Sequence, residues 1–258
     1  MIEILTPAQL EQARGCGRFV GGALQALRER VQPGTNLLEI DAWTRELIAA
    51  AGADSCYVDY APSFGTGPFG KVICTSVNDA VLHGLPHDYA LLAGDLLSLD
   101  FAVSLNGWVT DAAISFTVGG PGDPEDQRLI DTTVSALAAG TAAARPGGHI
   151  GDISAAVGAV LTGAGYRVNG DFGGHGVGRT MHQDPHIPNS GKPGRGYPLR
   201  PGMLLAIEPW VMRNTDKLKR DPDGWTLRSA NGARTAHTEH TVAITANGPE
   251  ILTLPESR

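Results

Sequence analysis

The sequence has few cysteines and no long apolar run, and each of these features argues against a class of protein. Three cysteines occur in 258 residues. An odd, scattered set of this kind fits a reducing compartment better than a disulfide framework. No apolar run approaches about 18 residues, which excludes a membrane-spanning helix. The first residues are interrupted by Glu3, Gln9 and Glu11, unlike a signal peptide. These features predict a cytoplasmic protein.

Composition narrows the class further. Hydrophobic residues make up 42% and charged residues 18% of the chain, which is typical of a folded protein and not of a disordered one. The net charge of −7 argues against a broad nucleic-acid surface. We expect a single domain over residues 1–258 that acts as a monomer, with no membrane or sequence-specific nucleic-acid partner.

Two helices are expected at the N-terminus. Thr6 and Gln9 form a capping box at the start of the first helix. Pro33-Gly34 ends this helix, and Thr35 caps a second one that runs to about Ala51.

A weak internal repeat follows these helices. Residues 31–40 resemble residues 144–153 at an offset of 113, and Gly52 matches Gly165 at the same offset. Chance similarity at Pro-Gly breaks is the alternative explanation. The repeat predicts two related halves, about 7–118 and 124–245, in an α+β domain with an antiparallel sheet covered by helices. Strand signals lie at 71–75, 96–104, 108–118, 203–210 and 235–245.

One predicted hairpin carries two aspartates. Asn106-Gly107 between apolar runs is a strong two-residue turn signal. With that turn, Asp100 lies opposite Ala113, and Asp111 points to the same face as Asp100. The two carboxylates are then diagonal neighbours about 7–8 Å apart at the backbone, which suits a shared metal or a metal pair. Two solvent-facing aspartates are the alternative. The apolar residues around Asp100 suggest that its face is not solvated.

Further polar candidates lie downstream and upstream of this hairpin. His175 and His182 occur among four glycines in residues 172–185, where glycine lets the backbone approach a ligand. Glu208 and Glu239 follow or enter apolar runs, and Glu is rarely buried without a partner. His83 lies beside a glycine-containing turn. Singly, each has an ordinary structural explanation.

Together these segments resemble the methionine aminopeptidases, within the pita-bread family that also contains prolidases and creatinases. The similarity extends from the first helix to residues 250–254. The family's ordered ligands, Asp, Asp, His, Glu and Glu, match Asp100, Asp111, His175, Glu208 and Glu239. The resemblance implies a pita-bread fold of two pseudo-symmetric α/β halves. It also implies removal of the N-terminal methionine from nascent proteins and peptides with a small second residue.

The resemblance further implies two divalent metal ions, drawn from Co, Mn, Fe, Zn or Ni, with a bridging hydroxide that attacks the peptide. Asp111 and Glu239 would bridge the metals. Asp100 would bind one metal, and His175 and Glu208 the other. Glu208 would also act as general base.

By the same resemblance, His182 would stabilise the oxyanion and His83 would contact the substrate near the scissile amide. Phe69, Cys74 and Trp225 would form the methionine pocket, since sulfur and aromatic edges suit a thioether.

Two positions depart from the family pattern. Met181 stands where the family has an aromatic residue, and Thr66 holds the place of an upstream aromatic residue, with Phe64 nearby. Both departures predict a looser or differently gated pocket.

The alternative functions are an Xaa-Pro aminopeptidase and a non-catalytic pita-bread protein that binds partners such as the ribosome. Retention of all five ligands argues against the second. The absence of a large extra N-terminal domain argues against the first.

Overall fold

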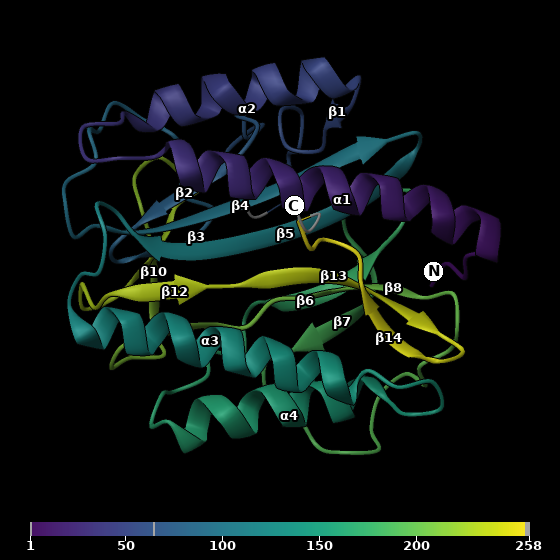
Figure 1. Ribbon diagram of the computed structural model, residues 1–258. Coiled ribbons are helices and arrows are strands. Elements are labelled where there is room, and N and C mark those ends of the chain that lie inside the picture. The colour runs from purple at the N-terminus through teal and green to yellow at the C-terminus, as the bar shows by residue number, and fades with distance from the viewer. Residues whose placement is uncertain (1, 64, 256–258) are drawn as a thin grey trace.

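Four helices cover one face of a curved antiparallel sheet in the computed structural model, which describes residues 2–63 and 65–255 (Figure 1). None of these helices is both long and apolar enough to span a bilayer. The helices are α1 (Pro7–Arg30), α2 (Leu37–Ala51), α3 (Pro124–Ala143) and α4 (Ile150–Gly163).

The helix starts follow local capping chemistry. α1 begins after the predicted capping box of Thr6 and Gln9. α2 begins one residue later than predicted, because Asn36 and not Thr35 is its cap. The Asn36 side chain accepts from the backbone N–H of Leu38 at 3.0 Å, and Glu39 accepts from the backbone N–H of Asn36 at 2.8 Å. Thr35 has a competing role, since its hydroxyl accepts from the backbone N–H of Gln32.

The strands form one large sheet and two small ones. The large sheet has the order β1-β4-β5-β13-β8-β6-β7, with β14 paired to β13 and β2 paired to β4. The strands are β1 (Asp54–Ser55), β2 (Cys74–Val77), β3 (Ala80–Leu82), β4 (Leu96–Leu105), β5 (Trp108–Thr117), β6 (Gly173–Val177), β7 (Gln183–Pro188), β8 (Leu204–Ile207), β9 (Trp210–Met212), β10 (Leu218–Arg220), β11 (Leu227–Ser229), β12 (Thr235–His237), β13 (Glu239–Thr245) and β14 (Gly248–Ile251).

The β4–β5 hairpin has the predicted register. Asp100 pairs with Ala113, and Asp111 pairs with Ala102. The alternation of β4 sends Leu97, Leu99, Phe101 and Val103 into the core under α1 and α2, while Asp100 points to the opposite face. The sequence had suggested that the apolar neighbours of Asp100 shield it from solvent, but these neighbours lie on the other face of the sheet. Other segments bury that carboxylate.

Three predicted strands have different bounds. The strand expected at residues 71–75 lies at β2, Cys74–Val77. The run at 203–210 divides into β8 and β9 at Glu208-Pro209, because proline has no N–H for a ladder. The run at 235–245 divides into β12 and β13 at Thr238, whose N–H donates to the carbonyl of Pro209 at 3.1 Å. The two breaks thus face each other.

The helix pairs repeat at a fixed interval. α4 begins at Ile150, 113 positions after Leu37, the first residue of α2. α1 and α2 share a core with β4 and β5, whereas α3 and α4 share one with β8 and β13. Duplication of a single ancestral half stays a prediction.

Candidate active site

A pocket lies on the sheet face that the helices leave bare, and the predicted site residues meet in it. They come from both halves of the chain and from the loops between strands. The pocket is lined by Tyr57, Tyr60, Phe69, Cys74, Leu82, His83, Asp100, Asp111, His175, Met181, His182, Glu208, Trp225 and Glu239.

Asp100 and Asp111 are fixed by the register of their hairpin and by two hydroxyl groups. The Tyr57 hydroxyl donates to Oδ1 of Asp100 at 2.5 Å. Burial, followed by the charges of Asp100 and Asp111, raises the pKa of Tyr57 well above its usual value, so it remains a donor. The Thr241 hydroxyl accepts from the backbone N–H of Asp111 at 2.9 Å and donates to its carbonyl at 2.8 Å. The carboxylate of Asp100 and the backbone of Asp111 are therefore both fixed.

Glu239 enters the same site from β13, which pairs with β5. Glu239 lies opposite Ala113, which also faces Asp100. Oδ1 of Asp111 and Oε1 of Glu239 are buried and have no hydrogen-bond partner among the described residues. Burial, and then the neighbouring carboxylates, raise the pKa values of Asp111 and Glu239 well above normal. Such buried, unpartnered oxygens are costly unless a cation neutralises them.

His175 presents one unprotonated nitrogen to these carboxylates. It lies on β6, opposite Ala206 of β8. Its Nδ1 is 2.9 Å from the Gly176 carbonyl, which can only accept, so the proton belongs to Nδ1 and Nε2 carries a lone pair. Nε2 lies 4.0 Å from Oδ2 of Asp111 and 3.9 Å from Oε1 of Glu208. Nε2 of His175 and these two carboxylate oxygens are thus three potential metal-ligand atoms that face one another.

These spacings suit a metal. Asp111, His175 and Glu239 each offer a ligand atom, and the three atoms lie within 4.8 Å of one another. Two bonds of about 2 Å to one ion can span such separations with little movement. Carboxylates with one imidazole suit Mn²⁺, Fe²⁺ or Co²⁺ and select weakly among them. The residues present therefore fit a divalent metal centre.

Glu208 lies at the Pro209 break and faces two imidazoles. Its Oε1 points to His175, and its Oε2 lies 3.5 Å from Nε2 of His237. Burial acts to raise the pKa of Glu208, but the contact with His237 is the largest effect that opposes it, and the net result is a lowered pKa. Glu208 therefore stays ionised more readily than Asp111 or Glu239, whose pKa values are raised.

His182 lies at the mouth of the pocket, just before β7. Its ring is 4.3 Å from that of His175 and 5.2 Å from that of Tyr60, measured between centroids. The crowded surroundings, and then His175, lower the pKa of His182, although part of the ring is open to solvent. The ring is neutral at pH 7 and can donate one hydrogen bond to a bound substrate.

His83 has a constrained backbone. It follows β3 with φ of 56°, a left-handed conformation that non-glycine residues adopt rarely and mostly at functional positions. Gly84 locks this bend, since its carbonyl accepts from Thr75 at 2.7 Å and its N–H donates to Ser76 Oγ at 3.1 Å. Burial lowers the pKa of His83, which keeps the ring neutral.

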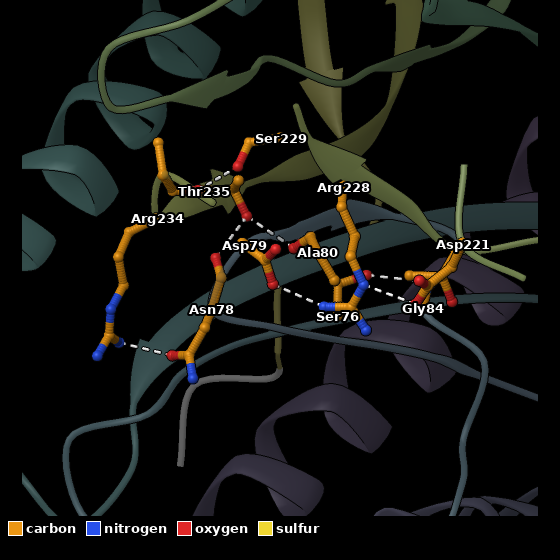
Figure 2. Close-up of polar contacts among 12 residues, drawn as sticks. Ser76, Asn78, Asp79, Ala80, Gly84, Asp221, Arg228, Ser229, Arg234 and Thr235 are labelled. Carbon is orange, nitrogen blue, oxygen red and sulfur yellow. Dashed lines mark hydrogen bonds and ion pairs between the residues drawn. The ribbon is translucent and has the colours of Figure 1, made fainter. Parts of the chain in front are cut away.

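A polar network ties the β2–β3 turn, which leads to His83, to the C-terminal half (Figure 2). Arg228 donates to Asp79 and to Asp221, each at 2.6 Å. Thr235 donates from its hydroxyl to the carbonyl of Ala80 at 2.7 Å, and its N–H donates to the carbonyl of Asn78 at 2.9 Å. The imidazole of one half is thereby fixed relative to the carboxylates of the other.

Trp225 forms one wall of the pocket from the turn between β10 and β11. The backbone N–H of Trp225 donates to Asp223 Oδ1 at 2.8 Å. The hydroxyl of the next residue, Thr226, accepts from the backbone N–H of Leu85 at 3.1 Å. The indole meets the Phe69 ring edge-on, with centroids 5.1 Å apart. This aromatic corner is held from both sides of the site.

Cys74 completes the apolar wall. It pairs with Asp100 across β2 and β4, and burial raises the pKa of its thiol well above normal.

The two departures from the family pattern are partly compensated. Met181 is buried and lines the pocket. Tyr60, which the sequence did not single out, supplies an aromatic ring beside His182. Thr66 instead faces Gly224. Phe64 lies outside the described residues.

The glycines around His175 serve strand packing. A Cβ on Gly174 would collide with the carbonyl of Ala206 on β8, and one on Gly176 with the carbonyl of Asp184 on β7. One on Gly178 would lie 2.5 Å from the Glu3 carboxylate. The close approach that these glycines permit is between chain segments, which accounts for them without a substrate; that they also make room for a substrate stays a prediction.

Three residues of the site were missed in the sequence. Tyr57 and Tyr60 lie in an irregular segment without periodicity, and His237 looked like an ordinary strand residue. Only the Tyr-rich stretch itself, with two tyrosines three residues apart before Phe69, could have signalled an aromatic wall. For His237 the alternation with Glu239 two residues later was the available signal.

Comparison with known proteins decides the family. The model of metallopeptidase family M24 matches residues 11–246. The chain belongs to metallopeptidase family M24. It is 41% identical over 255 residues to the methionine aminopeptidase of Clostridium perfringens, covering 98% of this chain and 99% of that one. Membership of this family implies that the chain uses a divalent metal.

Solved structures of the M24 family agree with this placement. Methionine aminopeptidase from Thermotoga maritima matches with a TM-score of 0.93 at 36% identity, over 98% of this chain and 100% of that one. The predicted pita-bread fold is confirmed. Prolidase from Pyrococcus furiosus matches with a TM-score of 0.75 at 21% identity, and the match covers 98% of this chain but 66% of that chain. The prolidase shares the fold.

Proposed function

We propose that this M24 protein is a methionine aminopeptidase that hydrolyses the first peptide bond of proteins and peptides beginning with methionine. One observation carries the proposal. Four carboxylates and an unprotonated imidazole nitrogen meet beneath an apolar, aromatic pocket. The metal-binding polar groups and the side-chain pocket are therefore adjacent, as cleavage next to a bound apolar side chain requires.

The metal ligands of this proposal are the five residues that the sequence pattern picked out. Asp111, His175 and Glu239 would hold the metal, because their ligand atoms lie close together and the buried oxygens of Asp111 and Glu239 have no hydrogen-bond partner among the described residues. Asp100 and Glu208, which line the same pocket, would complete the ligand set. Two divalent ions would balance the four carboxylate charges, lower the pKa of a water molecule and polarise the scissile carbonyl.

The remaining polar residues act on the substrate and on protons. Glu208, with its lowered pKa, accepts a proton as general base. His182 donates from its neutral ring to the substrate carbonyl as negative charge develops on that oxygen. His83, which also lines the pocket, contacts the substrate near the scissile amide.

The methionine side chain is assigned to the wall made by Phe69, Cys74 and Trp225, with Tyr60 added by the structure. The neutral thiol and the aromatic edges offer polarisable contacts to a thioether. A buried pocket of fixed aromatic rings favours an unbranched apolar side chain over a charged one.

The second residue of the substrate is expected to be small. This expectation comes from the family. Met-Ala and Met-Gly peptides should be cleaved faster than Met-Leu or Met-Ile peptides.

The cellular setting is proposed on composition. Three unpaired cysteines and a net charge of −7 support a monomeric cytoplasmic enzyme acting on nascent chains, with the ribosome as a candidate partner. Size-exclusion chromatography with light scattering would test the monomer.

A direct assay tests the activity. Mn²⁺-loaded protein is incubated with Met-Ala-Ser and, separately, with Ala-Pro-Ser, and free amino acids are measured. We expect release of methionine and no release of alanine. Release of alanine alone would favour the Xaa-Pro alternative, and release of neither by a metal-bound protein would favour the non-catalytic one.

A further inference from the structure

His237 is buried beside the metal centre but belongs to no set of predicted ligands. Its side chain is 2% exposed, and its Nε2 meets no hydrogen-bond partner with good geometry in the part of the chain that the structure describes. That nitrogen lies 3.5 Å from Oε2 of Glu208 and 3.8 Å from Oε2 of Glu239. A buried polar atom aimed at two carboxylates requires an explanation.

The placement of His237 follows from the two strand breaks. On β12 and β9, His237 pairs with Trp210. Glu208 precedes Trp210 by two residues, and Glu239 follows His237 by two, and the strands are interrupted at Pro209 and Thr238. Both glutamates place a carboxylate oxygen within 4 Å of the imidazole.

The backbone of His237 is fixed by a buried serine. The Ser115 hydroxyl donates to the carbonyl of His237 at 2.6 Å and accepts from its N–H at 3.0 Å. Ser98 lies 2.6 Å from Ser115 and supplies the remaining donor. The Ser115 hydroxyl has then used its one donor and both acceptor positions, so it cannot turn away. Ser98 and Ser115 are a cross-strand pair on the sheet face that bears Asp100.

Glu208 thus lies between two imidazoles, and the Nε2 atoms of both are directed at it. Nδ1 of His175 donates to the Gly176 carbonyl, which leaves its Nε2 for the metal. His237 faces only carboxylate oxygens, which accept and do not donate, so a proton on its Nε2 is favoured. At 3.5 Å, that nitrogen is a few tenths of an ångström beyond hydrogen-bond distance from Oε2 of Glu208.

We propose that His237 is a positioning residue of the metal centre: its Nε2–H donates to Oε2 of Glu208 and directs Oε1 toward the metal on the His175 side. The inference rests on the proposed metal site and deepens it. Partners of this kind orient ligating carboxylates, and their loss typically weakens metal binding by about 10–100-fold.

The test measures Mn²⁺ binding to metal-free full-length protein by isothermal titration calorimetry, at fixed pH and without substrate. His237→Leu removes the donor, and His237→Gln retains an N–H donor. His240→Leu is the matched control, because His240 is in the same region but turns to Thr253, 2.9 Å away. We expect His237→Leu to weaken Mn²⁺ affinity by about 10–100-fold with unchanged stoichiometry. His237→Gln should restore most of the loss, and His240→Leu should bind as the wild type does.

Three results would overturn the inference. One is wild-type Mn²⁺ affinity in His237→Leu. Another is an equal loss in His240→Leu. The third is a lower stoichiometry in both His237 variants together with an altered Co²⁺ visible spectrum, since His237 would then be a ligand. Should His237→Leu fail to fold, Ser115→Ala takes its place, with a smaller loss of affinity expected and wild-type affinity contradicting the inference.

These outcomes are separate from the fate of the proposed function. A protein that binds Mn²⁺ with this dependence on His237 but releases no methionine from peptides would contradict the proposed activity and leave the positioning role standing. A wild-type protein that binds no Mn²⁺ would overturn both.

Discussion

The two faces of the central sheet are formed by the same strands, but burial of a side chain has opposite effects on stability on the two faces. On β4, Leu97 and Leu99 pack under α1 and α2, where burial alone is favourable. Asp100, the residue after Leu99, points into the pocket, where burial is unfavourable until its charge is compensated. The helix face therefore accounts for stability, whereas the pocket face is a polar cluster whose stability depends on what binds it.

Removing one charge from the pocket face should have the largest effect on activity. Asp111→Asn takes away the proposed bridging carboxylate, so we expect methionine release to be abolished and metal content to fall. Without metal, the variant should be at least as stable to heat as the wild type, because a buried charge near Asp100 and Glu208 has been removed. Near-normal turnover with both metals bound would contradict the two-metal assignment.

Losing the donor at the pocket mouth should have the next largest effect. His182→Ala should lower kcat by roughly 10²–10³-fold, the range for one oxyanion donor, while Mn²⁺ stoichiometry stays unchanged. His186→Ala is the control, since His186 is an exposed imidazole on β7 outside the pocket lining. Loss of a metal in the His182 variant would make His182 a ligand and show that its assigned role is wrong.

Removing a single hydroxyl should have a smaller effect. Tyr57→Phe deletes the donor to Asp100, a hydrogen bond to a charged group worth about 1.5–3 kcal/mol, so Mn²⁺ affinity should fall by about tenfold or more. Tyr60→Phe is the matched control, because Tyr60 contributes its ring beside His182, and its Mn²⁺ affinity should not change. Calorimetric titration of both variants measures this. Equal affinities in the two variants would remove Tyr57 from the metal centre.

A change on the helix face should leave activity almost unaffected. Leu97→Ala opens a cavity in the fully buried core and should lower the free energy of unfolding by about 2–5 kcal/mol. The activity per folded molecule should stay that of the wild type, since the side chain points away from the pocket. Denaturant unfolding and an assay well below the melting temperature measure the two quantities. A parallel loss of activity would mean that the two faces are not independent.

Sequence reasoning predicted the parts of the site that local rules determine. The Asn106-Gly107 turn fixes the register of β4 and β5, and with it the shared face of Asp100 and Asp111. Capping likewise predicts the start of α1 after Thr6, and the Pro33-Gly34 break predicts its end close to the observed last residue, Arg30.

The remainder depends on tertiary contacts that no local pattern contains. Tyr57 reaches Asp100 from a segment 43 residues away, and His237 is fixed by Ser115 at a separation of 122 residues. The packing role of Gly174 is hidden for the same reason, since the carbonyl that it must avoid is on β8, a strand more than 20 residues downstream.

Restoring metal to metal-free protein tests the account most directly. Chelator-treated protein is titrated with Mn²⁺ while release of methionine from Met-Ala-Ser and thermal stability are followed together. We expect no release without metal, a rise in melting temperature with Mn²⁺, and activity that saturates at about two ions per chain. Methionine release by the metal-free protein, or a metal-loaded protein that is stabilised but inert toward the peptide, would contradict it.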